Sequence, residues 1–154
     1  PNALGKVVRG VIIHNWMAAI RGIESTPECD AMQITGAAPL IEHILEIDSD
    51  PIDVKRPAER RMIGFCYHFA VLHCALLRAK GVAARTRCGF ASYFDKGKWV
   101  DHWVVEYWDG DRWHLHDPQI GRAAPPCGRC RTRHLCRPRF PRRSAQRAQR
   151  DVSM

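Results

Sequence analysis

The sequence predicts an α+β domain in which one helix packs on an antiparallel sheet of three strands. Residues 65–80 carry apolar side chains three and four positions apart, which is the spacing of one buried helical face. Three predicted strands follow at 82–94, 99–108 and 112–117, with turn residues between them. Strands joined by short connections pair in antiparallel fashion, so the simplest arrangement is a meander that the helix covers.

The residues before this core predict a mainly helical part. Residues 5–22 favour a helix, although the β-branched run at 7–13 leaves a strand possible there. Pro39–Ile47 has an apolar stripe at helical spacing, with proline near its start. The basic segment 56–61 is interpreted as a connector with room for one helical turn.

Cys66 lies in the first turn of the predicted helix Phe65–Lys80. The positive end of the helix dipole favours a thiolate at such a position, and a nearby imidazolium favours it further. The other cysteines of the body are placed differently, with Cys74 in mid-helix, Cys88 in mid-strand and Cys29 in a polar loop. Cys66 is therefore the candidate nucleophile.

The turn between the last two predicted strands sets which residues face each other. If Asp-Gly at 109–110 forms a two-residue hairpin loop, Trp108 pairs with Asp111. Counting outward, His102 then lies directly opposite Asp117, with Cβ atoms about 4.5–5.5 Å apart. An aspartate in that place accepts a hydrogen bond from one ring nitrogen, fixes the tautomer and stabilises the imidazolium.

Five segments of the chain match the pattern of one family. They are GFC at 64–66, ALLRAKGVAAR at 75–85, CGF at 88–90, DHW at 101–103 and WHLHDP at 113–118. Through these motifs, the region from about 60 to 119 resembles the transglutaminase-like superfamily, and most of all its small bacterial members. Those relatives often carry Asn before the cysteine and Arg after it, where this chain has Phe65 and Tyr67.

The resemblance implies a papain-like core and cysteine-dependent acyl transfer or hydrolysis of amides through a thioester. It assigns the nucleophile to Cys66, the general base and acid to His102, and the orienting carboxylate to Asp117. The implied substrate is a peptide or protein amide, with water or an amine as acceptor, and neither a metal nor an organic cofactor is required. The backbone N–H of Cys66 is one oxyanion donor, and the second is expected from the N-terminal third.

The net charge of +8 is confined to the C-terminal end of the 154-residue chain. Residues 1–120 hold 14 basic and 15 acidic side chains, whereas residues 121–154 hold ten arginines and one aspartate. We therefore predict a transglutaminase-like domain at 1–120, helical to about residue 60 and with its catalytic-type core at 61–120. An Arg- and Pro-rich disordered tail follows at 121–154. Because the body is nearly neutral, nucleic acid is not the expected partner.

Three alternatives remain open. The fold also serves as an inactive peptide- or protein-binding module, and the basic tail allows a less favoured association with nucleic acid. The tail further contains four side chains of zinc-ligand type at close spacing, although a disordered segment is the preferred interpretation. These four residues are Cys127, Cys130, His134 and Cys136.

The remaining histidines and tryptophans are interpreted as structural. His68 and His73 are five residues apart and do not share one helical face, while His114 and His116 are expected to be solvated on the sheet face opposite His102. Trp103 is also placed to wall the site beside His102. The tryptophans expected mostly in the core are Trp99, Trp103, Trp108 and Trp113.

Seven cysteines without a secretion signal favour free thiols in the reducing cytosol over a disulfide framework. No apolar run approaches the length of a membrane span, so no membrane partner is expected.

Overall fold

The computed structural model describes residues 1–24, 26 and 33–123, all within the first of two units, residues 1–124 and 125–154. Residues 124–154 of the predicted disordered tail, with the candidate zinc ligands, lie outside the described residues. The elements in chain order are α1 (Asn2–Val11), β1 (Ile12–His14), α2 (Asn15–Ile20), α3 (Ala37–Ile47), the 3-10 turn η1 (Ala58–Arg60), β2 (Met62–Gly64), α4 (Cys66–Ala79), β3 (Ala84–Ala91), β4 (Val100–Trp108), β5 (Trp113–Asp117) and β6 (Arg122–Ala123).

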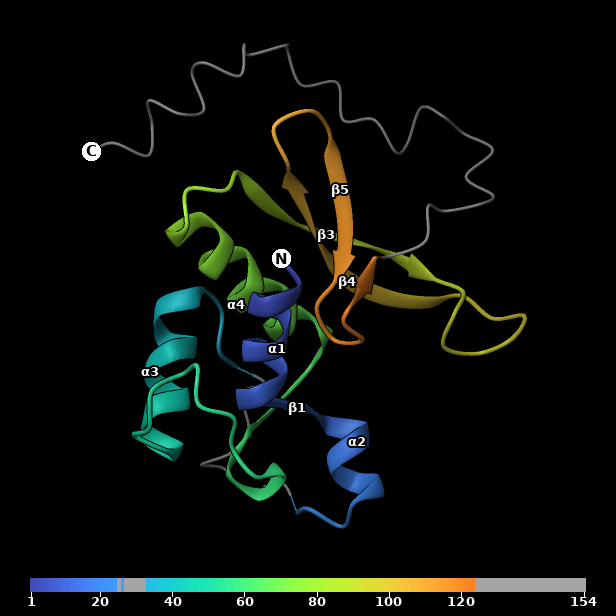
Figure 1. Cartoon of the computed structure of the whole chain (residues 1–154). Coiled ribbons are helices and arrows are strands. Elements are labelled where there is room, and N and C mark those ends of the chain that lie inside the picture. Colours follow the sequence, from blue (N-terminus) through green and yellow to red (C-terminus); the bar gives the residue numbers. More distant parts are fainter. Residues whose placement is uncertain (25, 27–32, 124–154) are drawn as a thin grey trace. The chain divides into compact units, whose positions relative to one another are not determined.

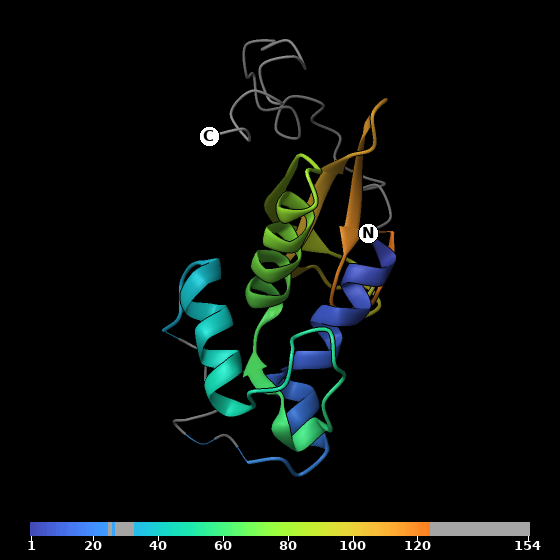
Figure 2. The same cartoon turned by 60° about the vertical axis from the view of Figure 1, so that its left-hand side comes forward.

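The fold class is the predicted one. Strands β3, β4, β5 and β6 form an antiparallel sheet in sequence order, and α4 packs on it through contacts with β3 and β4. Helix α3 lies on the other side of α4, as both views show (Figure 1, Figure 2). Strand β6 falls within the segment assigned to the disordered tail, so that assignment is wrong for residues 122–123, which pair with the end of β5.

A single helix over 5–22 is also a wrong prediction. The chain forms α1, leaves the helix at Ile12 and begins α2 only at Asn15. The β-branched pair at residues 12–13 explains the break, because it pairs in parallel with β2, a strand that the sequence analysis did not predict. This parallel pair directs the chain into α4.

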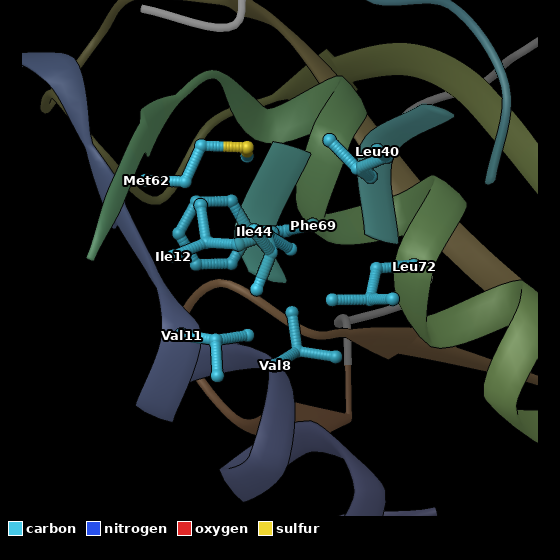
Figure 3. Packing of buried hydrophobic residues seen from close by; sticks show 8 residues of the cluster. All are labelled: Val8, Val11, Ile12, Leu40, Ile44, Met62, Phe69 and Leu72. Atoms are coloured by element: carbon cyan, nitrogen blue, oxygen red, sulfur yellow. The ribbon is translucent and has the colours of Figure 1, made fainter. Parts of the chain in front are cut away.

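The main core lies where α1, α3 and α4 meet, beside β1 and β2. Figure 3 shows its apolar side chains converging from these elements. The residues drawn are Val8, Val11, Ile12, Leu40, Ile44, Met62, Phe69 and Leu72. A second cluster fills the space between α4 and the sheet, with Ala70, Cys74 and Leu77 against Ala84 and Val105. Helix α4 is thus held on two sides, which fixes the place of its first residue.

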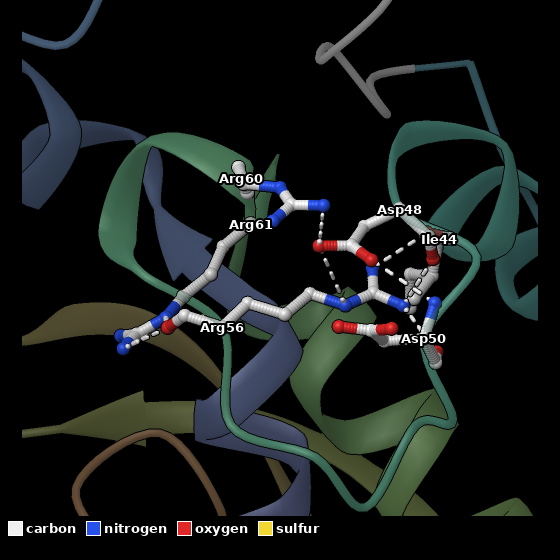
Figure 4. A network of polar contacts seen from close by, with 6 residues as sticks. All are labelled: Ile44, Asp48, Asp50, Arg56, Arg60 and Arg61. Atoms are coloured by element: carbon white, nitrogen blue, oxygen red, sulfur yellow. Dashed lines mark hydrogen bonds and ion pairs between the residues drawn. The ribbon is translucent and has the colours of Figure 1, made fainter.

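A buried arginine joins the end of α3 to the segment that leads to β2 (Figure 4). Arg56 is 2% exposed and donates to the backbone carbonyls of Ile44 (2.6 Å), Asp48 (2.5 Å) and Asp50 (3.0 Å). The buried carboxylate of Asp48 in turn pairs with Arg60 at 2.9 Å. Carbonyls at a helix end need such donors because no further turn supplies them.

The predicted register of the last hairpin is wrong by two residues. The first strand pair is Trp108 with Trp113, so the loop contains four residues, 109–112. Gly110 takes φ +110°, which favours glycine, and Asp109 Oδ1 accepts the backbone N–H groups of Asp111 and Arg112, each at 2.8 Å. This Asp-led turn stabilises the longer loop in place of the two-residue hairpin.

Two predictions about ring side chains are wrong as well. Trp99 and Trp113 are 52% and 41% exposed, and no tryptophan of the described residues belongs to the buried core. His116, expected in solvent, is 3% exposed and packs against His73 with ring centroids 4.9 Å apart. Burial lowers the pKa of both histidines, so this pair is uncharged at neutral pH.

Candidate active site

Cys66 is the first residue of α4, as predicted. The chain reaches it from β2 through Phe65, whose backbone N–H donates to Nδ1 of His68 at 3.0 Å. Side chains of the third helical residue often reach back in this way to cap a helix start. The cap fixes the direction in which the helix begins and therefore the direction of the Cys66 side chain.

The imidazole of His68 is held from both ends. Since Nδ1 accepts from Phe65, Nε2 carries the proton and donates to the carbonyl of Ile34 at 3.3 Å. A Cβ added at Gly64 would lie 3.2 Å from Nδ1 of this ring, a tight contact that glycine avoids. No function is predicted for His68 from the sequence, because its burial and cap are tertiary features.

His102 and Asp117 meet in the interior. Nε2 of His102 lies 2.8 Å from Oδ2 of Asp117, and the two residues are 4% and 0% exposed. Continuing the observed register would place Gln119, not Asp117, opposite His102. Because the register differs from the predicted one by two residues, both side chains keep the same face and meet as diagonal neighbours.

The carboxylate of Asp117 is fully occupied by donors. Oδ2 also accepts the hydroxyl of Tyr93 at 2.6 Å, and Oδ1 accepts the backbone N–H groups of Gln119 (2.9 Å) and Ile120 (3.3 Å). Burial alone would raise the pKa of Asp117, but the bonds from His102 and Tyr93 lower it, so the group stays ionised. Tyr93 was not predicted as a site residue, because it follows the end of β3 and carries no local signal.

The charge of His102 is set by its two acidic neighbours. Burial would lower its pKa, yet hydrogen bonds to Asp117 and Cys66 and the negative charges of both groups raise it to about 9. With Nε2 bonded to Asp117, Nδ1 is the ring nitrogen left for the Cys66 sulfur. The structure therefore brings all three predicted site residues together through one imidazole.

The three described cysteines differ in access. Cys66, Cys74 and Cys88 all carry free thiols. Cys66 is partly exposed, Cys88 is exposed, and Cys74 is buried, where burial raises the pKa of its thiol. Of these three described cysteines, only Cys66 combines solvent access with a place at a helix start and a histidine partner.

Aromatic rings surround the three residues. Tyr67 packs edge-on against Trp103 at 5.2 Å, which places Trp103 under the first turn of α4. Phe94 lies edge-on to His102 at 4.8 Å and is itself 37% exposed. Tyr67, which stands where relatives often carry Arg, thus has a packing role.

Across residues 1–24, 26 and 33–123, no group of three or more metal-ligating side chains comes together.

Comparison with known families agrees with this arrangement. The family model of the transglutaminase-like superfamily matches residues 41–118, from within α3 to just past β5. The chain belongs to this superfamily, whose chemistry is cysteine-based acyl transfer or hydrolysis and whose members are generally enzymes, with inactive ones among them. Searches of curated proteins and of solved structures gave no match. Within the described part of the chain, no helix is both long and apolar enough to span a bilayer.

Proposed function

We propose that this protein is a cysteine-dependent acyltransferase or hydrolase that acts on amides through a thioester, with Cys66 as nucleophile. The observation that carries the proposal is the position of the His102 ring, which bonds to Asp117 on one side and Cys66 on the other. A nucleophile, a base and a group that orients the base are the parts that such catalysis requires.

The first half-reaction breaks the amide bond. In the ion pair of Cys66 and His102 the proton already lies on the imidazole, and the sulfur forms a bond to the acyl carbon. The carbon–nitrogen bond then breaks, and the imidazolium of His102 gives its proton to the departing amine. Asp117 remains ionised throughout, because its hydrogen bonds stabilise the carboxylate and with it the imidazolium.

The second half-reaction releases the acyl group. Water or a second amine gives a proton to His102 and attacks the thioester carbon, and the Cys66 thiolate leaves. Peptide or protein amides are the proposed substrates, and a primary amine is the proposed acceptor in the transfer branch. The free thiols of Cys66, Cys74 and Cys88 support a reducing compartment such as the cytosol as the place of action.

Trapping of the acyl-enzyme tests the proposal. The full chain is mixed with p-nitrophenyl acetate, and its intact mass and peptide map are recorded before deacylation is complete. We expect one acetyl group on Cys66 in the wild type. Position 66 should not be acetylated in Cys66→Ser, and Cys66 should be acetylated more slowly in His102→Gln. Cys88→Ser is the matched control, because it removes an exposed thiol outside the site and should leave the acetylation of Cys66 unchanged. Absence of an acetyl group on Cys66 would favour the binding-module alternative.

A further inference from the structure

His14 is a histidine of the N-terminal part that the family match does not cover. It is the last residue of β1 and the Cα partner of Gly64, the last residue of β2. Cys66 follows Gly64 by two residues, so the parallel strand pair brings His14 to the start of the helix that carries the sulfur. The rings of His14 and Phe65 lie edge-on with centroids 6.0 Å apart.

Within the described part of the chain, one ring nitrogen of His14 has no hydrogen-bond partner. Its Nδ1 atom is buried and meets no donor or acceptor among the described residues. The ring is otherwise surrounded by the aromatic rings of Trp16, Phe65 and Phe69. A buried polar atom costs free energy unless it is bonded, so an orphan in such a place calls for a functional reason.

A neutral His14 can donate a hydrogen bond without adding a positive charge beside His102. Burial, with smaller electrostatic effects from the His102 and His68 rings, lowers its pKa to about 4. The ring is therefore neutral above about pH 5 and carries one N–H. The influence of His102 also means that the two rings lie close enough to interact through charge.

We propose that His14 is the second oxyanion donor of this site. In the reaction proposed above, on which this inference rests, the carbonyl oxygen becomes negative when Cys66 attacks. A ring N–H of His14 and the backbone N–H of Cys66 then donate to this oxygen together. The N–H of His14 keeps its proton; its hydrogen bond strengthens as the tetrahedral intermediate forms and weakens when the carbonyl is restored.

Two reactions at the same sulfur test this role. Iodoacetamide alkylates Cys66 by displacement of iodide at carbon, without an oxyanion, whereas p-nitrophenyl acetate acylates it through one. In the full chain, His14→Phe should slow acylation of Cys66 about 10²–10³-fold, which is typical for loss of one oxyanion donor. Alkylation of Cys66 should change less than about threefold, since it needs no such donor.

Conservative variants complete the experiment. His14→Gln retains a donor of similar reach and should recover at least a tenth of the acylation rate, while the shorter His14→Asn should not. His114→Gln removes a histidine of β5 that bonds to Asp109 and should leave both rates unchanged. The urea midpoint of each variant shows whether it is folded. If His14→Phe does not fold, the comparison of acylation rates between His14→Gln and His14→Asn tests the role of His14.

The outcomes separate this inference from the proposed function. Equal acylation rates in the wild type, His14→Phe and His14→Asn would overturn the role of His14, even if Cys66 is acylated. A parallel loss of alkylation and acylation would also overturn it, because His14 would then only position the thiol. A wild-type Cys66 that accepts no acetyl group would instead overturn the proposed function.

Discussion

Nε2 of His102 lies 2.8 Å from Oδ2 of Asp117, and both side chains are sealed from solvent. The carboxylate is bonded on every side, so it is rigid and ionised, and it holds the imidazole in one orientation. Cys66, partly exposed at the start of α4, interacts with the same ring. A nucleophilic site needs a base held in one orientation, here by Asp117, and a nucleophile that a substrate can reach, here Cys66.

Loss of the carboxylate should release the proton of His102. In Asp117→Asn, the pKa of His102 should fall from about 9, because the bond and the charge of Asp117 are lost while burial remains. The titration is followed by NMR of the ring signals, assigned with His102→Gln. Acylation of Cys66 should slow about 10²–10⁴-fold, because the base loses its orientation and its charge stabilisation. An unchanged midpoint would mean that Asp117 does not control the ring.

Tyr93 should act in the opposite direction. Its hydroxyl donates to the same oxygen that accepts from His102, so it competes for the negative charge of Asp117. Tyr93→Phe should therefore raise the pKa of His102 rather than lower it. The same NMR titration measures this shift, and acylation should change less than about tenfold. A fall in the pKa would contradict the competition that the shared oxygen implies.

Stability should depend on pH through His102. Its folded-state pKa of about 9 lies above the ordinary value of 6.5, so the folded chain binds the proton more tightly than the unfolded chain. The resulting stabilisation is complete below pH 6.5 and is lost as the pH rises through about 9. Urea unfolding at pH 6, 7.5 and 9.5 should show this decline in the wild type and a smaller decline in His102→Gln. Equal slopes in the two proteins would remove His102 as the cause.

A side chain at position 64 should disturb the start of α4. In Gly64→Ala the new Cβ would meet the His68 ring at 3.2 Å and displace a cap that two hydrogen bonds hold in place. We expect a loss of about 1 kcal/mol in unfolding free energy, as for other lost caps, together with slower alkylation of Cys66. Gly89→Ala is the control for stability, because its Cβ would meet nothing within 4 Å. Similar losses in both variants would argue against the cap.

The site was predictable to the extent that it depends on local sequence. Cys66 at a helix start follows from one strong apolar periodicity and a preceding glycine. The contact between His102 and Asp117 was predicted from a turn that the structure does not contain. That prediction survived because the error was two residues, and a shift of two keeps a strand side chain on its face. A shift of one would have separated them.

The supporting residues depend on distant contacts that leave no local pattern. Strands β1 and β2 have three residues each and pair across 50 positions of sequence, so neither His14 nor its proximity to Cys66 could be predicted. Tyr93 follows the end of β3, and only the folded chain brings its hydroxyl to Asp117. Burial of His116 likewise depends on its packing against α4.

The most direct test of an activated Cys66 is alkylation of the full chain by iodoacetamide at pH 6. Peptide mass mapping gives the rate at each cysteine. The pair formed with His102 should keep Cys66 reactive at a pH where ordinary thiols are protonated. Cys66 should therefore react at least tenfold faster than the exposed Cys88, and His102→Gln should abolish that advantage. Alkylation of Cys66 at or below the rate of Cys88, or an advantage that persists in His102→Gln, would contradict the account.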